Sequence, residues 1–359
     1  MPLKTLLSAW TWLAPPLGWL LLLGAGSGGA MNVVLAGGLI ACVLAAVHHA
    51  EVVAHKIGEP YGTLVLAVAV TVIEVALIVS LMLSGGPEAS GLARDTVFAA
   101  IMIILNGLVG LCLLLGAARH LEQRFGQAGV SAGLATLAAL AVLTLVLPNY
   151  TTTAPGPAYS GSQLAFVGLV SLVLYGVYVL IQTVRHRDYF LPSGALAHDE
   201  EAHAAPPSVM AAWVSLGLLV VSLGAVVLLA KSLAPTLEAA VANAGAPKAV
   251  VGVIIAALVL APESLAAVRA ARANRLQTSL NLALGSALAS IGLTIPVVAA
   301  VSLHMGWPLS LGLDAKSTVL LMLTLIVTTL SLGVGRTTVL QGVVHLVIFA
   351  VYLFTTVVP

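Results

Sequence analysis

The sequence contains very little charge for its length. Only 8% of its 359 residues are Asp, Glu, Lys or Arg, while 60% are hydrophobic and the mean hydropathy is +1.12. A soluble domain carries about 25% charged residues, so this composition excludes one. Runs of about 20 apolar residues, the length that crosses a bilayer core, recur along the chain. They do not alternate in polarity as the strands of a membrane β-barrel do. The sequence therefore predicts an all-α polytopic membrane protein with the lipid bilayer as a partner.

Other scarce features exclude further classes of protein. The net charge is +1, which gives no electrostatic basis for binding nucleic acid. The two cysteines, Cys42 and Cys112, both lie in apolar runs and are expected to be core residues rather than a disulfide or a metal site. The sequence has no phosphate-binding loop of the form Gly-x4-Gly-Lys-Ser/Thr, so ATP-driven pumping is not expected. No cofactor is predicted.

The apolar runs predict eleven membrane spans. The longest polar interruption, 185–208, is expected to be a solvated acidic linker. The predicted organisation is an extra N-terminal helix at 1–30, a first repeat at 31–184, the linker, and a second repeat at 209–359. The N-terminal run faintly resembles a signal peptide, but Pro15 and Pro16 interrupt it, which favours an uncleaved helix. The predicted spans cover roughly residues 6–24, 31–49, 62–84, 96–118, 130–148, 162–184, 209–231, 249–267, 280–302, 317–333 and 338–357.

Basic residues favour one orientation across the membrane. Of the 14 Lys and Arg residues, ten fall at the N-terminus or on loops after even-numbered spans, and four fall on the other side. Because Lys and Arg are enriched on the cytoplasmic side, this predicts a cytoplasmic N-terminus and a cytoplasmic linker. An odd number of spans then predicts an external C-terminus.

A ten-residue pattern, Glu-x6-Gly-x-Pro, occurs twice, each time before an apolar run that contains one more glutamate. The copies consist of Glu51, Gly58 and Pro60, followed by Glu74, and of Glu238, Gly245 and Pro247, followed by Glu263. They precede the third and the eighth predicted spans. Because five spans separate them, they enter the membrane from opposite sides. The pattern therefore predicts two inverted five-helix repeats, an arrangement of secondary transporters in which the site forms near the midplane.

Glu74 and Glu263 are the predicted residues for binding cations and protons. Glu74 lies twelve residues into its span, near mid-bilayer at about 1.5 Å per residue, and Glu263 lies at a comparable depth. A charge there costs at least about 2.5–3.5 kcal/mol unless it is compensated. Two carboxylates neutralise one Ca²⁺ and take up protons when the cation leaves, which is the minimum chemistry of a cation/proton antiporter. The alternative is a pair of protonated acids that hydrogen-bond to neighbouring helices.

Neutral polar residues inside the spans are candidate additional ligands, namely Thr71, Asn106, Ser286 and Ser290. They either complete a coordination shell or form ordinary hydrogen bonds between helices. Pro262, directly before Glu263, frees a backbone carbonyl, which either binds a cation or only accompanies a kink. No His or Cys lies beside Glu74 or Glu263 in the sequence, which argues against zinc.

Four titratable residues nearer the membrane surface are predicted gates or access points for protons and cations, namely Glu51, Glu238, His48 and His55. For the two glutamates, the alternative is a solvated helix end. His48, Glu51 and His55 share a helix face, which suits a proton relay or pH sensor. A membrane-embedded hydrolase built on the same cluster is another alternative, although the His-Glu-x-x-His order is absent. The acidic linker, with Asp199, Glu200 and Glu201 between His198 and His203, either senses cytosolic cations or pH, or is simply solvated.

The sequence resembles the calcium/proton exchanger family of the Ca²⁺:cation antiporter superfamily, and within it the bacterial ChaA-type Ca²⁺(Na⁺,K⁺)/H⁺ antiporters. The resemblance rests on residues 55–64, 71–74, 261–263 and 279–296, and it extends over essentially the whole chain. It implies an extra first span before two inverted five-span repeats, and a bacterial inner membrane location with a periplasmic C-terminus. It also implies exchange of cytosolic Ca²⁺ for external H⁺ at Glu74 and Glu263.

The chain departs from the Gly-Asn-Ala-x-Glu motif of that family. Val70 and Thr71 stand for Gly and Asn in the first copy, and Val259 and Leu260 stand for them in the second. The missing Asn side chains leave exchange of Na⁺ or K⁺ open, although Ca²⁺ is the leading predicted substrate. A passive cation channel is the remaining alternative. A homo-oligomer is compatible with the sequence.

Overall fold

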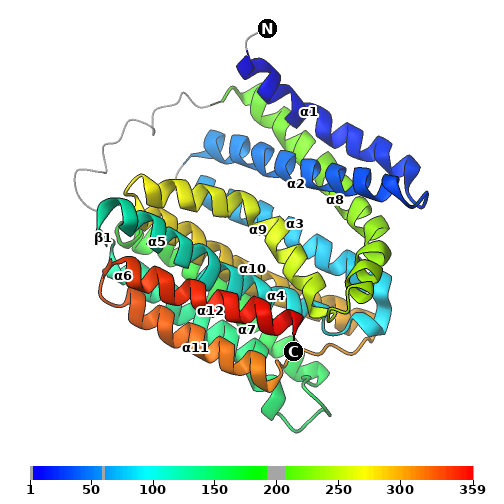
Figure 1. Ribbon diagram of the computed structural model, residues 1–359. Coiled ribbons are helices and arrows are strands. Elements are labelled where there is room, and N and C mark those ends of the chain that lie inside the picture. The colour runs from blue at the N-terminus through cyan, green and yellow to red at the C-terminus, as the bar shows by residue number, and fades with distance from the viewer. Residues whose placement is uncertain (1–2, 59–60, 192–206, 359) are drawn as a thin grey trace. The chain divides into compact units, whose positions relative to one another are not determined.

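The computed structural model describes residues 3–58, 61–191 and 207–358, and these are almost entirely helical (Figure 1). The α-helices are α1 (Leu3–Leu21), α2 (Ala30–Ile57), α3 (Tyr61–Gly85), α4 (Leu92–Met102), α5 (Val109–His120), α6 (Gln127–Ala141), α7 (Gly161–Leu180), α8 (Val209–Asn243), α9 (Ala249–Arg272), α10 (Leu276–Met305), α11 (Ala315–Leu332) and α12 (Val339–Val357). The π-helical segments are η3 (Ile103–Leu108), η4 (Val142–Val146) and η6 (Ile181–Arg185). The 3₁₀ turns are η1 (Leu22–Gly24), η2 (Gly86–Ala89), η5 (Leu147–Tyr150) and η7 (Arg187–Tyr189), and the strands are β1 (Gln123–Arg124) and β2 (Arg336–Thr337).

Ten helical stretches in the described part of the chain are long and apolar enough to cross a membrane. The π-helical segment η3 joins α4 and α5 into one of these stretches, Leu92–His120. The helix α1, which contains Pro15 and Pro16, precedes the ten and is an eleventh helix. The predicted all-α polytopic fold is therefore confirmed.

Two helices extend well beyond the apolar runs that predicted them. The spans predicted at 31–49 and 209–231 belong to α2 and α8, which continue to Ile57 and Asn243. Each ends where a glycine of the repeated motif adopts a positive φ, 77° at Gly58 and 68° at Gly245. Only glycine adopts such backbone angles readily, so the helix stops where the backbone turns and not where hydrophobicity ends. Pro60 of the first motif lies outside the described residues.

The chain forms two compact units. Unit 1 combines Met1–Gly86 with His203–Val251 and contains α1, α2, α3 and α8. Unit 2 combines Pro87–Ala202 with Gly252–Pro359 and contains α4 to α7, most of α9, and α10 to α12. Each unit draws on both predicted repeats. The boundaries of the repeats stay a prediction, because the two compact units reflect which helices pack together and not which segments are copies of each other.

Unit 1 is held together by α2 and α8, which pack along each other and are both contacted by α1 and α3. The ring of His49 on α2 joins three helices. Its Nε2 lies 3.0 Å from the carbonyl oxygen of Thr11 on α1, and its Nδ1 lies 3.3 Å from Oγ of Ser215 on α8. Pro15 has no N–H for the Thr11 carbonyl one turn earlier, so this carbonyl can accept a bond from another helix.

Unit 2 shows reciprocal packing between the two halves of the sequence. α12 packs against α5, and α7 packs against α10 (Figure 1). Both contacts need glycine, because a Cβ added at Gly110 would lie 2.8 Å from Cβ of His345, and one at Gly292 would lie 2.7 Å from Cβ of Tyr175.

The connecting segments of unit 2 show the same reciprocal arrangement. The first five-helix set comprises α2, α3, the joined α4 and α5, α6 and α7, and the second set comprises α8 to α12. β1 lies between the third and fourth helices of the first set. It pairs antiparallel with β2, which lies between the fourth and fifth helices of the second set. The Ala158–Ser310 bridge joins the converse pair of segments and is also antiparallel. Such reciprocal contacts are expected when two five-helix sets are inverted copies.

Candidate functional site

Glu74 is buried in unit 1. It lies in the second half of α3, and only 2% of its surface is exposed. Thr71, one turn earlier on the same helix face, is also buried. Four apolar residues near them on α3 are buried as well, namely Val70, Ile73, Leu77 and Ile78. A carboxyl group inside an apolar span is costly without a function, so its burial agrees with a role in binding cations or protons.

Glu263 lies in unit 2 on α9 and is half-buried. The hydroxyl of Ser286 on α10 donates a hydrogen bond to its Oε2. Ser290 lies one turn further along α10 and is also buried. Hydrogen bonds to a carboxylate are stronger than those between neutral groups, so Ser286 fixes one oxygen of this acid. The structure thus brings together two of the predicted site residues, Glu263 and Ser286.

The surroundings of Glu263 contain two further features. Pro262 lies inside α9 and has no N–H for the carbonyl of Leu258 one turn earlier. Tyr175 of α7 lies within electrostatic range of Glu263. Tyr175 is not among the residues predicted from the sequence, because it is one of two tyrosines, with Tyr178, in an apolar run and nothing else sets it apart.

Asn106 belongs to a buried hydrogen-bond network in unit 2. Its Nδ2 donates to Oγ1 of Thr324 on α11 at 2.8 Å, and its Oδ1 lies 3.2 Å from Nδ1 of His345 on α12. Because the amide nitrogen is the donor to Thr324, the oxygen accepts from His345. All three side chains are fully buried. This network agrees with the second alternative for Asn106, hydrogen bonding between helices.

The residues predicted as gates or access points lie towards the ends of α2 and α8. Glu51 and His55 are exposed, His48 is half-buried, and Glu238 is exposed. The buried histidine of this region is His49, which lies off the helix face shared by His48, Glu51 and His55 and is therefore not among the predicted residues. The acidic linker from His198 to His203 lies outside the described residues.

The described residues contain no group of three or more His, Cys, Asp or Glu side chains that could hold a metal ion. Cys42 and Cys112 are both free and buried. The Sγ atom of Cys42 lies 3.3 Å from the carbonyl oxygen of Ala14, so this thiol packs between α2 and α1.

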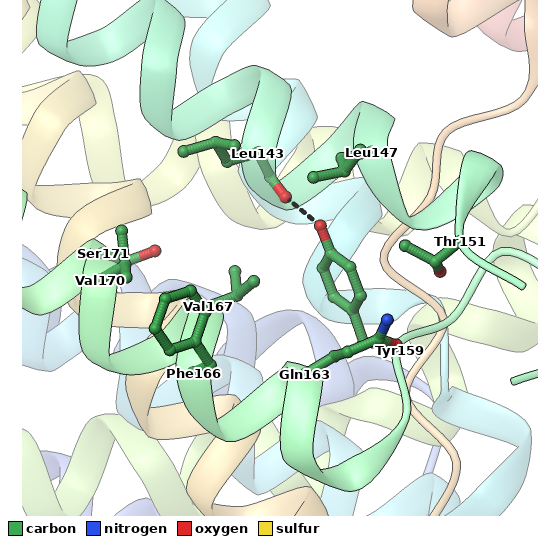
Figure 2. A pocket seen from close by; sticks show the side chains of 9 residues that line it. All are labelled: Leu143, Leu147, Thr151, Tyr159, Gln163, Phe166, Val167, Val170 and Ser171. Atoms are coloured by element: carbon green, nitrogen blue, oxygen red, sulfur yellow. Dashed lines mark hydrogen bonds between the residues drawn. The ribbon is translucent and has the colours of Figure 1, made fainter. Parts of the chain in front are cut away.

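A cavity of about 210 Å³ lies between α7 and the segments η4 and η5 in unit 2 (Figure 2). Its lining is mainly apolar and contains no acid or histidine. Figure 2 shows the hydroxyl of Tyr159 pointing at the carbonyl oxygen of Leu143, to which it donates at 2.5 Å. The N–H of Leu147 donates to the carbonyl oxygen of Val142 in the π-helical segment. In an α-helix this N–H would bond to the carbonyl of Leu143, which is therefore available to accept from Tyr159. Burial raises the pKa of Tyr159 to about 12, so the phenol stays a neutral donor. The cavity has no group that would bind a cation by charge.

Comparison with known proteins identifies relatives along nearly the whole chain. A family model described as sodium/calcium exchanger protein matches residues 28–184 and 214–358. The ionic transporter y4hA of Sinorhizobium fredii is 54% identical over 324 residues, which are 90% of this chain and 88% of the relative. The sodium-potassium/proton antiporter ChaA of Escherichia coli is 37% identical over 327 residues, 91% of this chain and 88% of the relative. A Ca²⁺/H⁺ antiporter of Aphanothece halophytica is 26% identical over 283 residues, 74% and 75% of the two chains.

Solved structures share the fold at low sequence identity. The structure of YfkE superposes with a TM-score of 0.72 at 17% identity, covering 98% of this chain and 99% of the other. The H⁺/Ca²⁺ exchanger CAX gives the same TM-score at 16% identity, covering 98% and 88%. The family model and the relatives at 54% and 37% identity show that the chain belongs to the sodium/calcium exchanger protein family, and that it is a secondary transporter and not an enzyme.

Proposed function

We propose that this chain is a proton-coupled antiporter of small inorganic cations, with Glu74 and Glu263 as the groups that bind cation and proton in turn. The observation that carries the proposal is the intramembrane acid in the second helix of each five-helix set, with a hydroxyl donor on Glu263. A carboxylate that loses its cation inside a membrane is stabilised by taking up a proton. Cation and proton therefore compete for the same groups, and alternating access would convert this competition into exchange.

We propose Na⁺ and K⁺ as the leading cargo. The family's Asn side chains are absent before both glutamates, where this chain has Thr71 and Leu260. Ca²⁺ takes six to eight oxygen ligands, and each missing amide removes one. A monovalent cation needs fewer oxygens and less compensating charge. The 37% identity to a sodium-potassium/proton antiporter supports this order, which differs from the Ca²⁺ preference that the sequence predicted.

Ca²⁺ is the second candidate cargo. Two carboxylates neutralise one divalent cation, and a Ca²⁺/H⁺ antiporter is among the more distant relatives. Bacterial relatives support a bacterial inner membrane as the location. The cytoplasmic N-terminus predicted from the basic residues is part of the proposal.

Proton movement in reconstituted liposomes tests the function and the cargo together. The liposomes enclose a pH-sensitive dye, carry an inward or outward pH gradient, and receive Na⁺, K⁺, Ca²⁺ or Mg²⁺ outside. We expect Na⁺ and K⁺ to drive proton release, Ca²⁺ to drive less, and an E74Q/E263Q double variant to drive none. Cation flux that persists without any proton movement would identify a passive channel. Release driven by Ca²⁺ alone would reverse the proposed cargo.

A further inference from the structure

A short ribbon at one end of unit 2 holds two arginines side by side. β1 and β2 pair with Gln123 opposite Thr337 and Arg124 opposite Arg336 (Figure 1 labels β1). Gln123 and Thr337 point inward and are buried, and the side-chain amide of Gln123 donates to the carbonyl of Ala271 at 2.9 Å. The inward pair therefore anchors the ribbon. The outward pair presents two guanidinium groups from a fixed backbone.

The two arginines carry more positive charge than their neighbours neutralise. Like charges directly opposite each other destabilise a strand pair. Glu122 contacts both, with its oxygens 3.4 Å from Arg124 and 3.9 Å from Arg336. One carboxylate against two guanidinium groups leaves one positive charge, and the arginine side chains are 83% and 60% exposed. Arg119, near the end of α5, is exposed and has no acidic partner in the described part of the chain. The surface therefore favours an anion.

Leu121 adds an apolar element to this charged surface. Its φ of 63° and ψ of −54°, with a hydrogen bond of 2.8 Å from Glu122 N–H to the His120 carbonyl, define a γ-turn of the rare, strained type. This strained backbone leaves the leucine side chain 84% exposed. Val334, shortly before β2, is also exposed.

The ribbon lies at the ends of membrane-spanning helices. Leu121 directly follows the span Leu92–His120, and Val334 lies between the spans Ala315–Leu332 and Val339–Val357. Exposed apolar side chains at such a position lie where headgroups meet acyl chains. A soluble anion would gain nothing from Leu121 or Val334, whereas a phospholipid can contact the arginines and these apolar side chains at once.

We infer that the β1–β2 ribbon binds the phosphate of an anionic phospholipid. Arg124 and Arg336 bind the phosphate oxygens, for which the planar guanidinium group is suited. Leu121 reaches into the acyl region beside the headgroup. None of these residues belongs to the proposed exchange site, so lipid binding here is separate from the proposed function.

Thermal unfolding of the full-length protein in detergent micelles tests this site without measuring transport. The micelles contain increasing fractions of phosphatidylglycerol or phosphatidylcholine, and a third series contains soluble glycerol phosphate. We expect only phosphatidylglycerol to raise the unfolding temperature of the wild type. R124Q/R336Q should need about tenfold more of this lipid for half of the effect, because charge-assisted hydrogen bonds to the phosphate are lost. R187Q, which removes an exposed arginine of η7, is the matched control and should respond like the wild type.

Two further variants keep the test decisive if R124Q/R336Q does not fold. R124K/R336K keeps the charge but loses the planar fork, and should shift the lipid response in the same direction by less. L121G relieves the γ-turn, so without lipid it should unfold at the wild-type temperature or above, yet need more phosphatidylglycerol. An equal response to phosphatidylcholine, a response to glycerol phosphate, or wild-type lipid dependence of R124Q/R336Q, R124K/R336K or L121G would overturn the inference.

Discussion

The helices that carry the two acids, α3 and α9, present the same residue in different surroundings. Glu74 follows Ile73 in a helix without proline and is almost completely buried. Glu263 follows Pro262, is half-buried, and accepts a hydrogen bond from Ser286. The two copies of the sequence pattern share the position of the acid but not its environment. We therefore expect both acids to be required, while different neighbours tune each of them.

The largest effect is expected from removing either charge. E74Q and E263Q should each reduce cation-driven proton release to the level of liposomes without protein, because an amide cannot exchange a cation for a proton. D188N, which changes an exposed carboxylate of η7 away from the predicted site and access residues, serves as the control and should keep most of the activity. Normal exchange by either single variant would show that the two acids are not equivalent in function.

The next effect concerns stability and compares the two motif glycines. G58A and G245A should each lower the free energy of unfolding by about 1–3 kcal/mol, because both backbones have a positive φ that alanine adopts only with strain. Nothing lies within 4 Å of a Cβ added at either position, so conformation alone sets this cost. Thermal unfolding in detergent measures it.

Gly37 provides the matched control for this comparison. It is an exposed glycine inside α2, with open space around it and no positive φ, and G37A should stabilise the protein by about 0.5–1 kcal/mol. Equal destabilisation by G37A and G58A would mean that loss of glycine, and not the helix stop, is responsible.

A smaller effect on cation binding is expected from removing the hydroxyl group of α10 that donates to Glu263. S286A should raise the half-saturating cation concentration about tenfold, since losing one partner of a hydrogen bond to a carboxylate costs about 1–3 kcal/mol. S290A, one turn along α10, and T71A, on α3, are the comparison variants. Cation titration of proton release measures all three. If T71A has the largest effect, the neighbours of Glu74 rather than those of Glu263 tune the site.

The smallest expected effect concerns the stability contributed by helix capping, which differs between α6 and α11, the fourth helices of the two sets. The carboxylate of Asp314 accepts a hydrogen bond of 2.7 Å from Ser317 N–H at the start of α11, whereas no side chain among the described residues caps α6 after Gly126. D314A should cost about 1 kcal/mol of stability, and D314N should cost less because asparagine also caps helices. Thermal unfolding at neutral pH measures the difference.

Acid pH should sharpen this last comparison. Burial alone would raise the pKa of Asp314, but hydrogen bonds from Ser317 and the charges of Lys316 and Arg94 outweigh it and lower the pKa. A lowered pKa stabilises the folded state above the unfolded value of about 3.9, and this contribution disappears as the pH falls further. D314N should lack this acid-dependent loss. The same acid slope in wild type and D314N would assign it to other carboxyl groups.

The fold class and the location of both acids were predictable from the sequence. Hydrophobicity averaged over about 20 residues is a strong signal, because every span must satisfy the same bilayer. The duplicated Glu-x6-Gly-x-Pro pattern, with an acid downstream of each copy, indicated Glu74 and Glu263. The contact between Ser286 and Glu263 agrees with the selection of both residues for one site.

The partners of the other polar residues were not predictable. The sequence predicts Asn106 either as an additional ligand or as a hydrogen-bonding residue between helices. In the structure its side-chain amide forms hydrogen bonds with Thr324 and His345, which are more than 200 residues away in the sequence. Nothing in the sequence indicates that His49 joins α1, α2 and α8. An isolated polar residue in an apolar run has the same appearance in the sequence whether it faces an ion or another helix.

The sequence by itself determined that this protein spans a membrane, and it places a glycine that ends a helix in each copy of the repeated motif. These are local properties, because they depend on the polarity of one segment or on the backbone freedom of one glycine, such as Gly58 or Gly245. The tertiary structure decided which hydroxyl donates a hydrogen bond to Glu263 and which helices contact His49. It also decided that Arg124 and Arg336 lie opposite each other on the two strands of a ribbon. Those contacts join segments distant in the chain, and only packing brings such segments together.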